Sequence, residues 1–351
     1  MNYRNGRLYM QSPFMKGQYN LNTDYFGSLP FKLGNFARES LLNALNLLNI
    51  RSGDKIALPS LICKDLLAPI NILNLKIIYY DVDHRLQPIG LETLEPASLI
   101  LAINYFGFPQ DMASFHFYCK KHGAVVIEDN AHGFLSVDEN KCPLGFRGDI
   151  GIFSFRKVVP VRNGSAFVVN NPNLLERHNI TTDQMPIGVF PLTYQKRNVM
   201  RIFSPLLGNQ HILLSSKLVR MLRKIRSGNP MITSSPDSEY KIPVSDDKNL
   251  TFLHDLSTLD PNFEVTRRRE LYHRAEQALA SSPIEPIYQS LPQNTSPLGY
   301  PFYCSKNNIE KVVSRLKRAS LECHTWPDLP QSFRDSAPSF YQDLHLVRFK
   351  W

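Results

Sequence analysis

The chain has 351 residues, of which 43% are hydrophobic, and it carries a formal net charge of +9. This length and composition allow one large and one smaller domain and exclude wholesale disorder. The basic residues are scattered, with no zinc-finger spacing, aromatic RNA-binding motif or basic tail, so nucleic acid is not an expected partner. A phosphate-bearing cofactor or substrate accounts for the excess positive charge equally well.

The cysteines are far apart and include no C-x-x-C pair. They are Cys63, Cys119, Cys142, Cys304 and Cys323. This pattern predicts neither a disulfide framework nor a metal site. The N-terminal residues have no apolar core of signal-peptide length, and no apolar run approaches the length that spans a membrane. We therefore expect a cytoplasmic protein.

Residues 1–35 are polar, aromatic and turn-rich, and we expect an arm over the main domain. Helix and strand patterns then alternate. They are a helix over 38–49, a strand over 55–59, a helix over 64–74, strands over 76–83 and 99–106, and a helix over 111–122. Such alternation predicts an α/β fold with a mainly parallel central sheet and helices on both faces.

The stretch 124–170 contains three short apolar runs bounded by turn residues, as is typical of buried strands: 124–127, 149–155 and 165–169. Four chemistry-bearing side chains lie between and after them: Asp129, His132, Ser154 and Lys157. Ligands of such sheets bind at the carboxyl ends of the strands. A carboxylate after one strand and a lysine after another predict a site for pyridoxal 5′-phosphate (PLP).

The pattern weakens after residue 171. A basic amphipathic helix is predicted over 211–226, and a solvated helix is the preferred interpretation over contact with an anionic membrane. A helix over 266–279, a strand over 299–304 and a helix over 307–320 predict a smaller α+β domain. The expected organisation is therefore an arm (1–35), a large PLP-binding domain (36–230), a link (231–262) and a small C-terminal domain (263–351), for which a reduced or truncated form is left open.

Two sequence motifs, in this order and at this separation, carry a family resemblance. They are Asp-Asn-Ala-His at 129–132 and Gly-Asp-Ile-Gly-Ile-Phe-Ser-Phe at 148–155. Followed by Lys157 and Gly-Ser-Ala at 164–166, they resemble the DegT/StrS-type sugar aminotransferases. These are PLP-dependent transferases of fold type I, the aspartate-aminotransferase fold. The resemblance covers 36–170 well and 265–330 weakly.

The resemblance implies a role for each of the four side chains. Asp129 corresponds to the acid that pairs with the pyridine nitrogen of the cofactor and keeps it protonated. Lys157 corresponds to the lysine that binds the cofactor covalently and moves the substrate proton. Ser154 corresponds to a hydroxyl that binds the phosphate, and His132 to a residue beside the phenolic oxygen. Lys157 stands two residues closer to the Ser-Phe pair than is usual in the family.

Two expected partners of the cofactor are replaced. The family's Gly-Thr pair is Ala37-Arg38 here, so we expect Arg38 to bind the phosphate with its guanidinium and Ser40 to add a hydroxyl. The aromatic residue that commonly covers the cofactor ring falls at Cys63, which cannot stack. His132 or an unassigned residue is left to cover the ring.

The resemblance implies an aminotransferase that moves an amino group from an amino acid, with glutamate as expected donor, to a keto-sugar. A nucleotide-linked sugar of polysaccharide or glycan biosynthesis is expected, as is a homodimer, because the family's site lies at the dimer interface. A PLP-dependent sugar dehydratase is one alternative, although such members tend to carry His at the lysine position. A non-catalytic protein of this fold, with a structural or regulatory role, is the other.

Overall fold

The computed structural model describes residues 21–159, 161, 163–178, 236–243, 252–257 and 259–349. The first part of the arm (1–20), the basic helix over 211–226 and parts of the link (231–235, 244–251 and 258) lie outside these residues.

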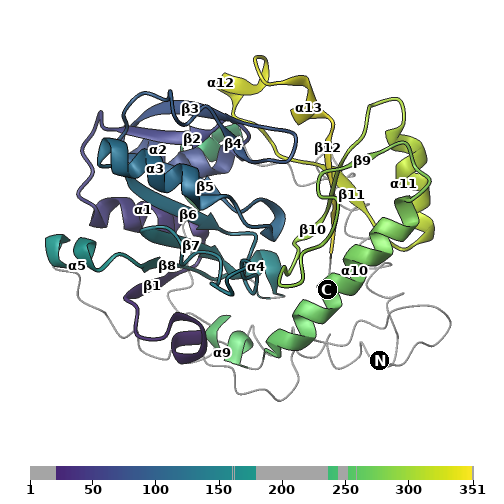
Figure 1. Ribbon diagram of the computed structural model, residues 1–351, viewed down its shortest axis with the longest axis horizontal. Helices are drawn as coiled ribbons and strands as arrows, with labels where there is room; N and C mark the ends of the chain where they lie inside the picture. The colour runs from purple at the N-terminus through teal and green to yellow at the C-terminus, as the bar shows by residue number, and fades with distance from the viewer. Residues whose placement is uncertain are drawn as a thin grey trace.

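An eight-stranded sheet forms the centre of the large domain (Figure 1). Its strands are β1 (Phe31–Gly34), β2 (Lys55–Pro59), β3 (Lys76–Val82), β4 (Pro88–Ile89), β5 (Leu99–Ile103), β6 (Val125–Asn130), β7 (Ile150–Ser154) and β8 (Ser165–Val169). Their order across the sheet is β1-β8-β7-β6-β5-β2-β3-β4. The run from β3 through β2, β5 and β6 to β7 is parallel, whereas β1, β4 and β8 join antiparallel.

The predicted mainly parallel sheet is therefore confirmed, and its antiparallel edge has a simple cause. The segment 155–164 between β7 and β8 is too short for a parallel crossover, which needs a dozen residues or more. The chain consequently turns back and pairs β8 antiparallel to β7. All five residues of β5 are buried, as expected for a central strand covered on both faces.

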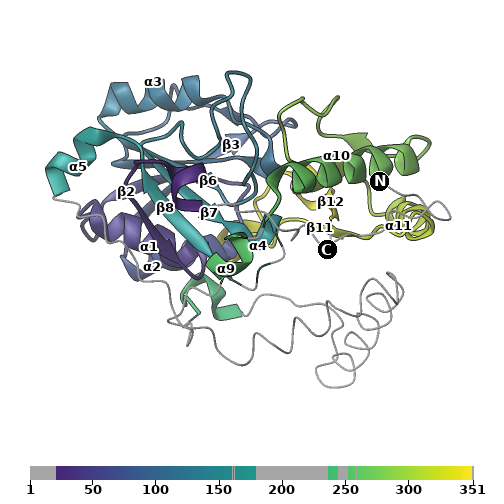
Figure 2. The same cartoon turned by 90° about the horizontal axis from the view of Figure 1, so that it is seen from below.

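Helices cover both faces of this sheet (Figure 2). Those of the large domain are η1 (Leu21–Phe26), α1 (Ala37–Leu47), η2 (Lys64–Leu66), α2 (Leu67–Ile72), η3 (Tyr105–Gly107), α3 (Met112–His122), α4 (Phe155–Val158) and α5 (Pro172–His178). Helix α3 lies on one face, and α1 and α2 lie on the other. Asp111 caps α3 by accepting a hydrogen bond from the Ala113 N–H, and Gly123 ends it in a left-handed conformation (φ 69°).

The described end of the chain forms the small α+β domain predicted from the sequence. Its elements are α10 (Pro261–Leu279), β9 (Glu285–Pro286), β10 (Gly299–Tyr303), α11 (Ile309–Arg318), β11 (Cys323–Thr325), α12 (Gln331–Arg334), α13 (Ser339–Gln342) and β12 (Leu344–Arg348). Before it in the chain, η4 (Pro236–Glu239) contacts η2 and α2, and α9 (Phe252–Ser257) contacts η1. The strands pair antiparallel in the order β11-β12-β10-β9, and α10 packs against β10 and α11.

Two elements lie where the sequence predicted an arm and a link. Strand β1 pairs with β8 and is therefore part of the large sheet, although the residues up to 35 were assigned to the arm. A strand of four residues is too short to show a clear alternating pattern. Helix α9 falls within the expected link, and its Phe252 ring stacks on Phe155 at 5.8 Å between centroids.

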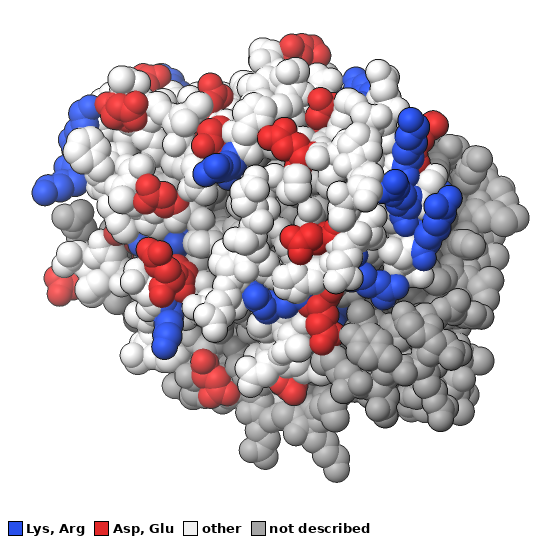
Figure 3. All heavy atoms as spheres, turned by 45° about the vertical axis from the view of Figure 1, so that its right-hand side comes forward, with Lys and Arg blue, Asp and Glu red and all other residues white. Residues whose placement is uncertain are grey.

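None of the helices that the structure describes is both long and apolar enough to cross a membrane. On the face shown in Figure 3, acidic and basic side chains are interspersed over much of the described surface, with one group of basic side chains toward the right.

Candidate active site

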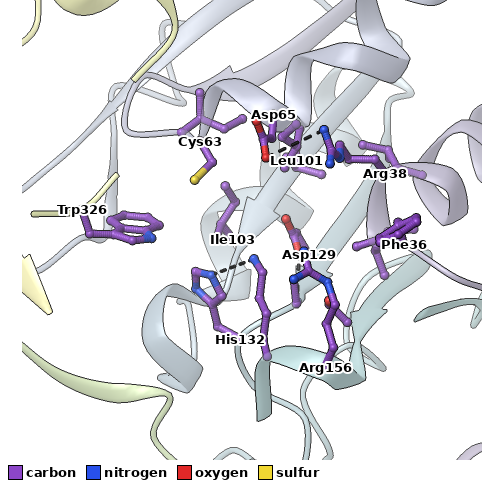
Figure 4. A pocket seen from close by; sticks show the side chains of 18 residues that line it. Phe36, Arg38, Cys63, Asp65, Leu101, Ile103, Asp129, His132, Arg156 and Trp326 are labelled. Carbon is purple, nitrogen blue, oxygen red and sulfur yellow. Dashed lines mark hydrogen bonds and ion pairs between the residues drawn. The ribbon is translucent and has the colours of Figure 1, made fainter. Parts of the chain in front are cut away.

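A cavity lies at the carboxyl ends of β2, β5, β6 and β7 (Figure 4). Strands β2 and β5 are neighbours in the sheet, although β3 follows β2 in the chain, so the strand order reverses between them. Open α/β sheets bind ligands at such a reversal, because the loops that follow the two strands diverge there. The empty space within it, about 870 Å³, includes the open solvent at its mouth.

Asp129 lies on β6 and is 8% exposed. Its Oδ1 accepts a hydrogen bond of 2.8 Å from the Ala131 N–H, and within the described part of the chain this carboxylate forms no ion pair. Burial raises the pKa of Asp129, while nearby Lys157 and the Ala131 N–H partly oppose that rise. A buried carboxylate without a cationic partner is costly, so this group calls for a cation in the cavity.

The neighbouring acid on the same strand has a different environment. Glu128 is fully buried, and its Oε1 lies 2.6 Å from Nη2 of Arg147. Oε1 also accepts a hydrogen bond from the Asn104 side chain, and Oε2 accepts one from the Gly148 N–H. Successive side chains of a strand point to opposite faces, which separates this paired carboxylate from that of Asp129. Glu128 therefore has a structural role, in which its buried carboxylate joins β6 to Arg147 and to the backbone of Gly148.

Lys157 lies on α4, the single turn of helix that follows β7. Its Nζ lies 3.1 Å from Nε2 of His132. Burial lowers the pKa of Lys157, and the acidic groups of Cys63 and Asp129 only partly offset that effect. Among the described lysines, Lys157 alone lines the cavity. The structure therefore places a lysine with a lowered pKa where the shortened Ser-Phe-Arg-Lys segment predicts it.

His132 lies between Lys157 and two aromatic rings. Its Nδ1 accepts a hydrogen bond of 3.2 Å from the Phe106 N–H, and its ring is nearly parallel to that of Phe106. The Trp326 ring meets it edge-on at 5.7 Å between centroids. Burial lowers the pKa of His132 well below its ordinary value, and the nearby charge of Arg348 adds to this lowering. His132 is consequently a neutral imidazole at physiological pH.

Two arginines lie at the end of the cavity away from Trp326 (Figure 4). Arg38, in the first turn of α1, lies 3.8 Å from Asp65, a long separation for an ion pair. Arg156, on α4, lies 5.9 Å from the centre of the Phe36 ring and has no acidic partner within the described residues. Desolvation lowers the pKa of Arg156, and the charges of Arg38 and Arg348 add to this lowering. This end of the cavity is therefore cationic.

Ser154 and Ser40, both expected near the phosphate, are placed differently. Ser154 ends β7 and lines the cavity. Ser40 does not line the cavity, because it points toward β8 and its Oγ lies 2.8 Å from Oγ of Ser165. A helix turns by about 100° per residue, so Arg38 and Ser40 lie on different sides of α1.

The sequence did not predict the positions of Arg156 and Trp326. Arg156 had a signal, because it stands in the shortened interval directly before Lys157. Trp326 had no such signal in the sequence, because it belongs to the C-terminal domain and reaches the cavity where the segment around Asp328 contacts Lys64 of the large domain. The Lys64 ammonium pairs with Asp328 at 3.0 Å, and the Lys64 N–H donates to the Asp328 carbonyl at 2.9 Å. Cys63, at the expected position of a stacking aromatic, lines the cavity close to Trp326.

The side chains of this cavity fit pyridoxal phosphate. The unpaired Asp129 carboxylate suits a protonated pyridine nitrogen, and the Lys157 amine suits an aldehyde carbon. The two arginines and the Ser154 hydroxyl suit a phosphate. The fold and this cavity define a PLP-dependent transferase of fold type I.

A comparison with protein families agrees with this class. Residues 35–185 match the DegT/DnrJ/EryC1/StrS aminotransferase family. This match spans the motifs at 129–132 and 148–155 and confirms the resemblance to PLP-dependent sugar aminotransferases that they carry.

Solved structures of low sequence identity share the fold over most of this chain. The aminotransferase TlmJ from Streptoalloteichus hindustanus is 18% identical, with 91% of this chain and 80% of that chain covered and a TM-score of 0.58. Helicobacter pylori PseC, an aminotransferase involved in the biosynthesis of pseudoaminic acid, is 15% identical, with 91% and 81% covered and a TM-score of 0.59. The E. coli GDP-4-keto-6-deoxy-D-mannose-3-dehydratase with bound hydrated PLP is 16% identical, with 93% and 85% covered and a TM-score of 0.57.

Proposed function

We propose that this protein transfers an amino group from an amino acid, with glutamate as donor, to the carbonyl carbon of a keto-sugar. The observation that carries the proposal is Lys157, a buried amine with a lowered pKa that shares one cavity with Asp129 and His132. Bond formation to an aldehyde and removal of a proton from carbon both require a neutral amine. Burial lowers the pKa of the Lys157 amine and so favours that form.

Each residue of the cavity has its own role in the proposed reaction. Bound PLP supplies an electron sink that stabilises negative charge on the substrate carbon. Asp129 holds the proton on the pyridine nitrogen, and in return the pyridinium supplies the cation that this buried carboxylate lacks. Lys157 Nζ receives the proton from the substrate carbon and returns it in the reverse half-reaction. Arg38, Arg156 and Ser154 hold the phosphate.

A nucleotide-linked keto-sugar is the proposed acceptor. The support is the family match together with the names of similar structures, which concern the biosynthesis of pseudoaminic acid and a GDP-linked keto-deoxysugar. We further propose that the reaction belongs to polysaccharide or glycan biosynthesis in the cytoplasm. A homodimer is proposed because the family's site lies at the interface between two subunits.

Dehydration of a deoxysugar is the second candidate, because a dehydratase shares the fold. Lys157 favours the aminotransferase, since dehydratases of the family tend to carry His in its place. The two reactions differ in what they do with the nitrogen. Transamination leaves it on the sugar, whereas dehydration releases a keto-sugar that contains none.

An absorption spectrum of the purified protein tests the proposal. The protein should bind PLP with a visible absorption band that disappears when glutamate is added and returns when a 2-keto acid is added. The Lys141→Ala variant is the matched control, because Lys141 is exposed and lies in a loop away from the cavity. A protein that binds no PLP, or whose band is unchanged by every amino acid, would contradict the proposal and favour the non-catalytic alternative.

A further inference from the structure

The two ring nitrogens of His132 have different partners. Nδ1 lies 3.2 Å from the backbone nitrogen of Phe106, whose N–H points at it. Nε2 lies 3.1 Å from Nζ of Lys157. A backbone N–H can only donate a hydrogen bond, so Nδ1 is the acceptor and carries no proton.

This contact determines where the proton of the imidazole lies. A neutral imidazole carries one proton, and with Nδ1 bare that proton is on Nε2. Nε2–H then donates toward Lys157, and the lysine must accept. An ammonium group has three donors and no acceptor, whereas a free amine has a lone pair. The hydrogen-bond pattern is consistent only with a neutral lysine.

We propose that His132 is a positioning residue whose tautomer is locked by the Phe106 backbone, and that its Nε2–H holds Lys157 as the free amine in the cofactor-free protein. The lock itself depends only on the geometry of this chain, while its use in catalysis rests on the proposed function. A neutral, oriented amine is ready to attack the aldehyde of an incoming cofactor. Protonation of the amine removes the lone pair, so the lysine is released from His132 when it takes up a proton.

The Phe106 N–H is held in place by its own turn. Phe106 adopts a left-handed conformation (φ 56°, ψ 16°), which is uncommon for a residue with a large side chain. Gly107 follows with φ 88°, and a Cβ there would lie 2.8 Å from the Ser296 carbonyl. The Phe106 carbonyl accepts a hydrogen bond of 2.8 Å from the Leu298 N–H. Strain of this kind persists only where the surroundings enforce it, and here it aims an N–H at Nδ1.

A buried arginine connects the backbone beside Lys157 with the segment that holds the Phe106 turn. Arg268 on α10 is fully buried and donates to the carbonyls of Leu298 and Val158. Leu298 holds Phe106, and Val158 directly follows Lys157. The contacts form a closed ring from the lysine through His132, Phe106, Leu298 and Arg268 back to α4. The histidine and the amine are therefore positioned by one network.

The electrostatic surroundings of the amine agree with this assignment. Desolvation is the largest influence on the pKa of Lys157 and lowers it. The titratable and charged groups that act on the amine are Cys63, Asp129, His132, Arg156 and Arg348. The two arginines favour the neutral amine, while the carboxyl and the thiol favour the ammonium form.

Nitrogen-15 NMR of the full-length, cofactor-free protein tests the tautomer directly. Near neutral pH, His132 should show a protonated Nε2 and a bare Nδ1, with its signals assigned from their loss in His132→Gln. An imidazolium signal, or a proton on Nδ1, would overturn the proposal. Because no cofactor is present, this result is independent of whether the protein is an aminotransferase.

Carbon-13 NMR of the lysine Cε atoms tests the effect on the amine. The pKa of Lys157 should lie below the ordinary value of a lysine side chain. Removing the donor with His132→Phe should raise the pKa of Lys157, whereas His132→Gln, which retains an N–H donor, should raise it less. An equal rise in both variants, or no rise, would show that the donor does not hold the amine. If His132→Phe fails to fold, the tautomer measurement on the unmodified protein still decides the question.

Discussion

The strand end of the cavity and its outer margins are built differently. At the strand end, Asp129, His132 and Lys157 lie on β6 or directly after β6 and β7, and hydrogen bonds between these residues and the backbone hold them. At the outer margins, Arg38, Arg156 and Trp326 come from α1, α4 and the C-terminal domain, and the arginines have few or distant partners.

The difference shows that groups that react and groups that only bind the cofactor need different precision of position. Reacting groups need positions fixed within a fraction of an ångström, which strands and the turns after them provide. A phosphate or the face of a ring can be bound by several arrangements of cations, hydroxyls and aromatic rings. Replacement of a Gly-Thr pair by Arg38, or of a stacking aromatic by Cys63, is therefore compatible with an unchanged strand end. The predictions below test this division, from the largest expected effect to the smallest.

Replacing Lys157 with Ala should have the largest effect. Loss of the amine removes proton transfer, so the rate of the half-reaction with glutamate should fall by roughly 10²–10⁴-fold or more. Stopped-flow absorbance of the bound cofactor measures this rate, with Lys141→Ala as control. A variant that retains a rate within tenfold of the unmodified protein would show that another group moves the proton.

Replacing Asp129 with Asn should slow the reaction and stabilise the cofactor-free protein. Burial raises the pKa of Asp129, so between the unfolded and folded pKa values the folded protein binds more protons, and its stability falls as pH rises through that window. The ionised carboxylate is thus destabilising at neutral pH, and Asn removes this charge.

Thermal unfolding of cofactor-free Asp129→Asn at pH 7 should therefore give a higher Tm than the unmodified protein, while the half-reaction falls by roughly 10²-fold. A lower Tm at pH 7 would mean that the carboxylate already has a cationic partner in the cofactor-free protein.

Replacing Arg156 with Gln should weaken cofactor binding without altering the strand end. A hydrogen bond to a charged group contributes about 1.5–3 kcal/mol, so the Kd for PLP should rise roughly 10- to 100-fold. The Kd for pyridoxal, which lacks the phosphate, should be unchanged. The exposed Arg85→Gln variant is the control. Equal weakening for both ligands would place Arg156 away from the phosphate.

Replacing Trp326 with Leu should have the smallest effect. An aromatic pair contributes about 0.5–1.5 kcal/mol beyond its buried area, so affinity for PLP should fall roughly 2- to 12-fold. Tryptophan emission reports the contact, because Trp326 and Trp351 are the two tryptophans of the chain. PLP should quench the unmodified protein more than Trp326→Leu. Equal quenching would place Trp326 away from the cofactor.

The strand end of the site was predictable because it depends on local sequence. Asp129 and His132 follow an apolar run, and Lys157 follows another, so the parallel arrangement alone brings them to one edge of the sheet. The strands β2, β5, β6 and β7 were all recognised from their apolar residues, as was α3 from its cap and its terminal glycine.

The outer parts were less predictable because they depend on long-range contacts. Trp326 reaches the cavity through contacts between segments far apart in sequence, among them the pairing of Lys64 with Asp328. Strand β12 lies between β10 and β11, a position that no local pattern indicates. Ser40 was assigned to the phosphate end from its place in the first turns of α1, but the helix turns its hydroxyl to Ser165.

Peptide mapping after borohydride reduction of the PLP-bound protein tests the central claim most directly, because reduction makes the bond between cofactor and amine permanent. The account predicts that mass spectrometry finds the added pyridoxyl phosphate on Lys157, and that Lys141→Ala gives the same result. A cofactor attached to a different lysine, or to none, would contradict the assignment of this cavity as the active site.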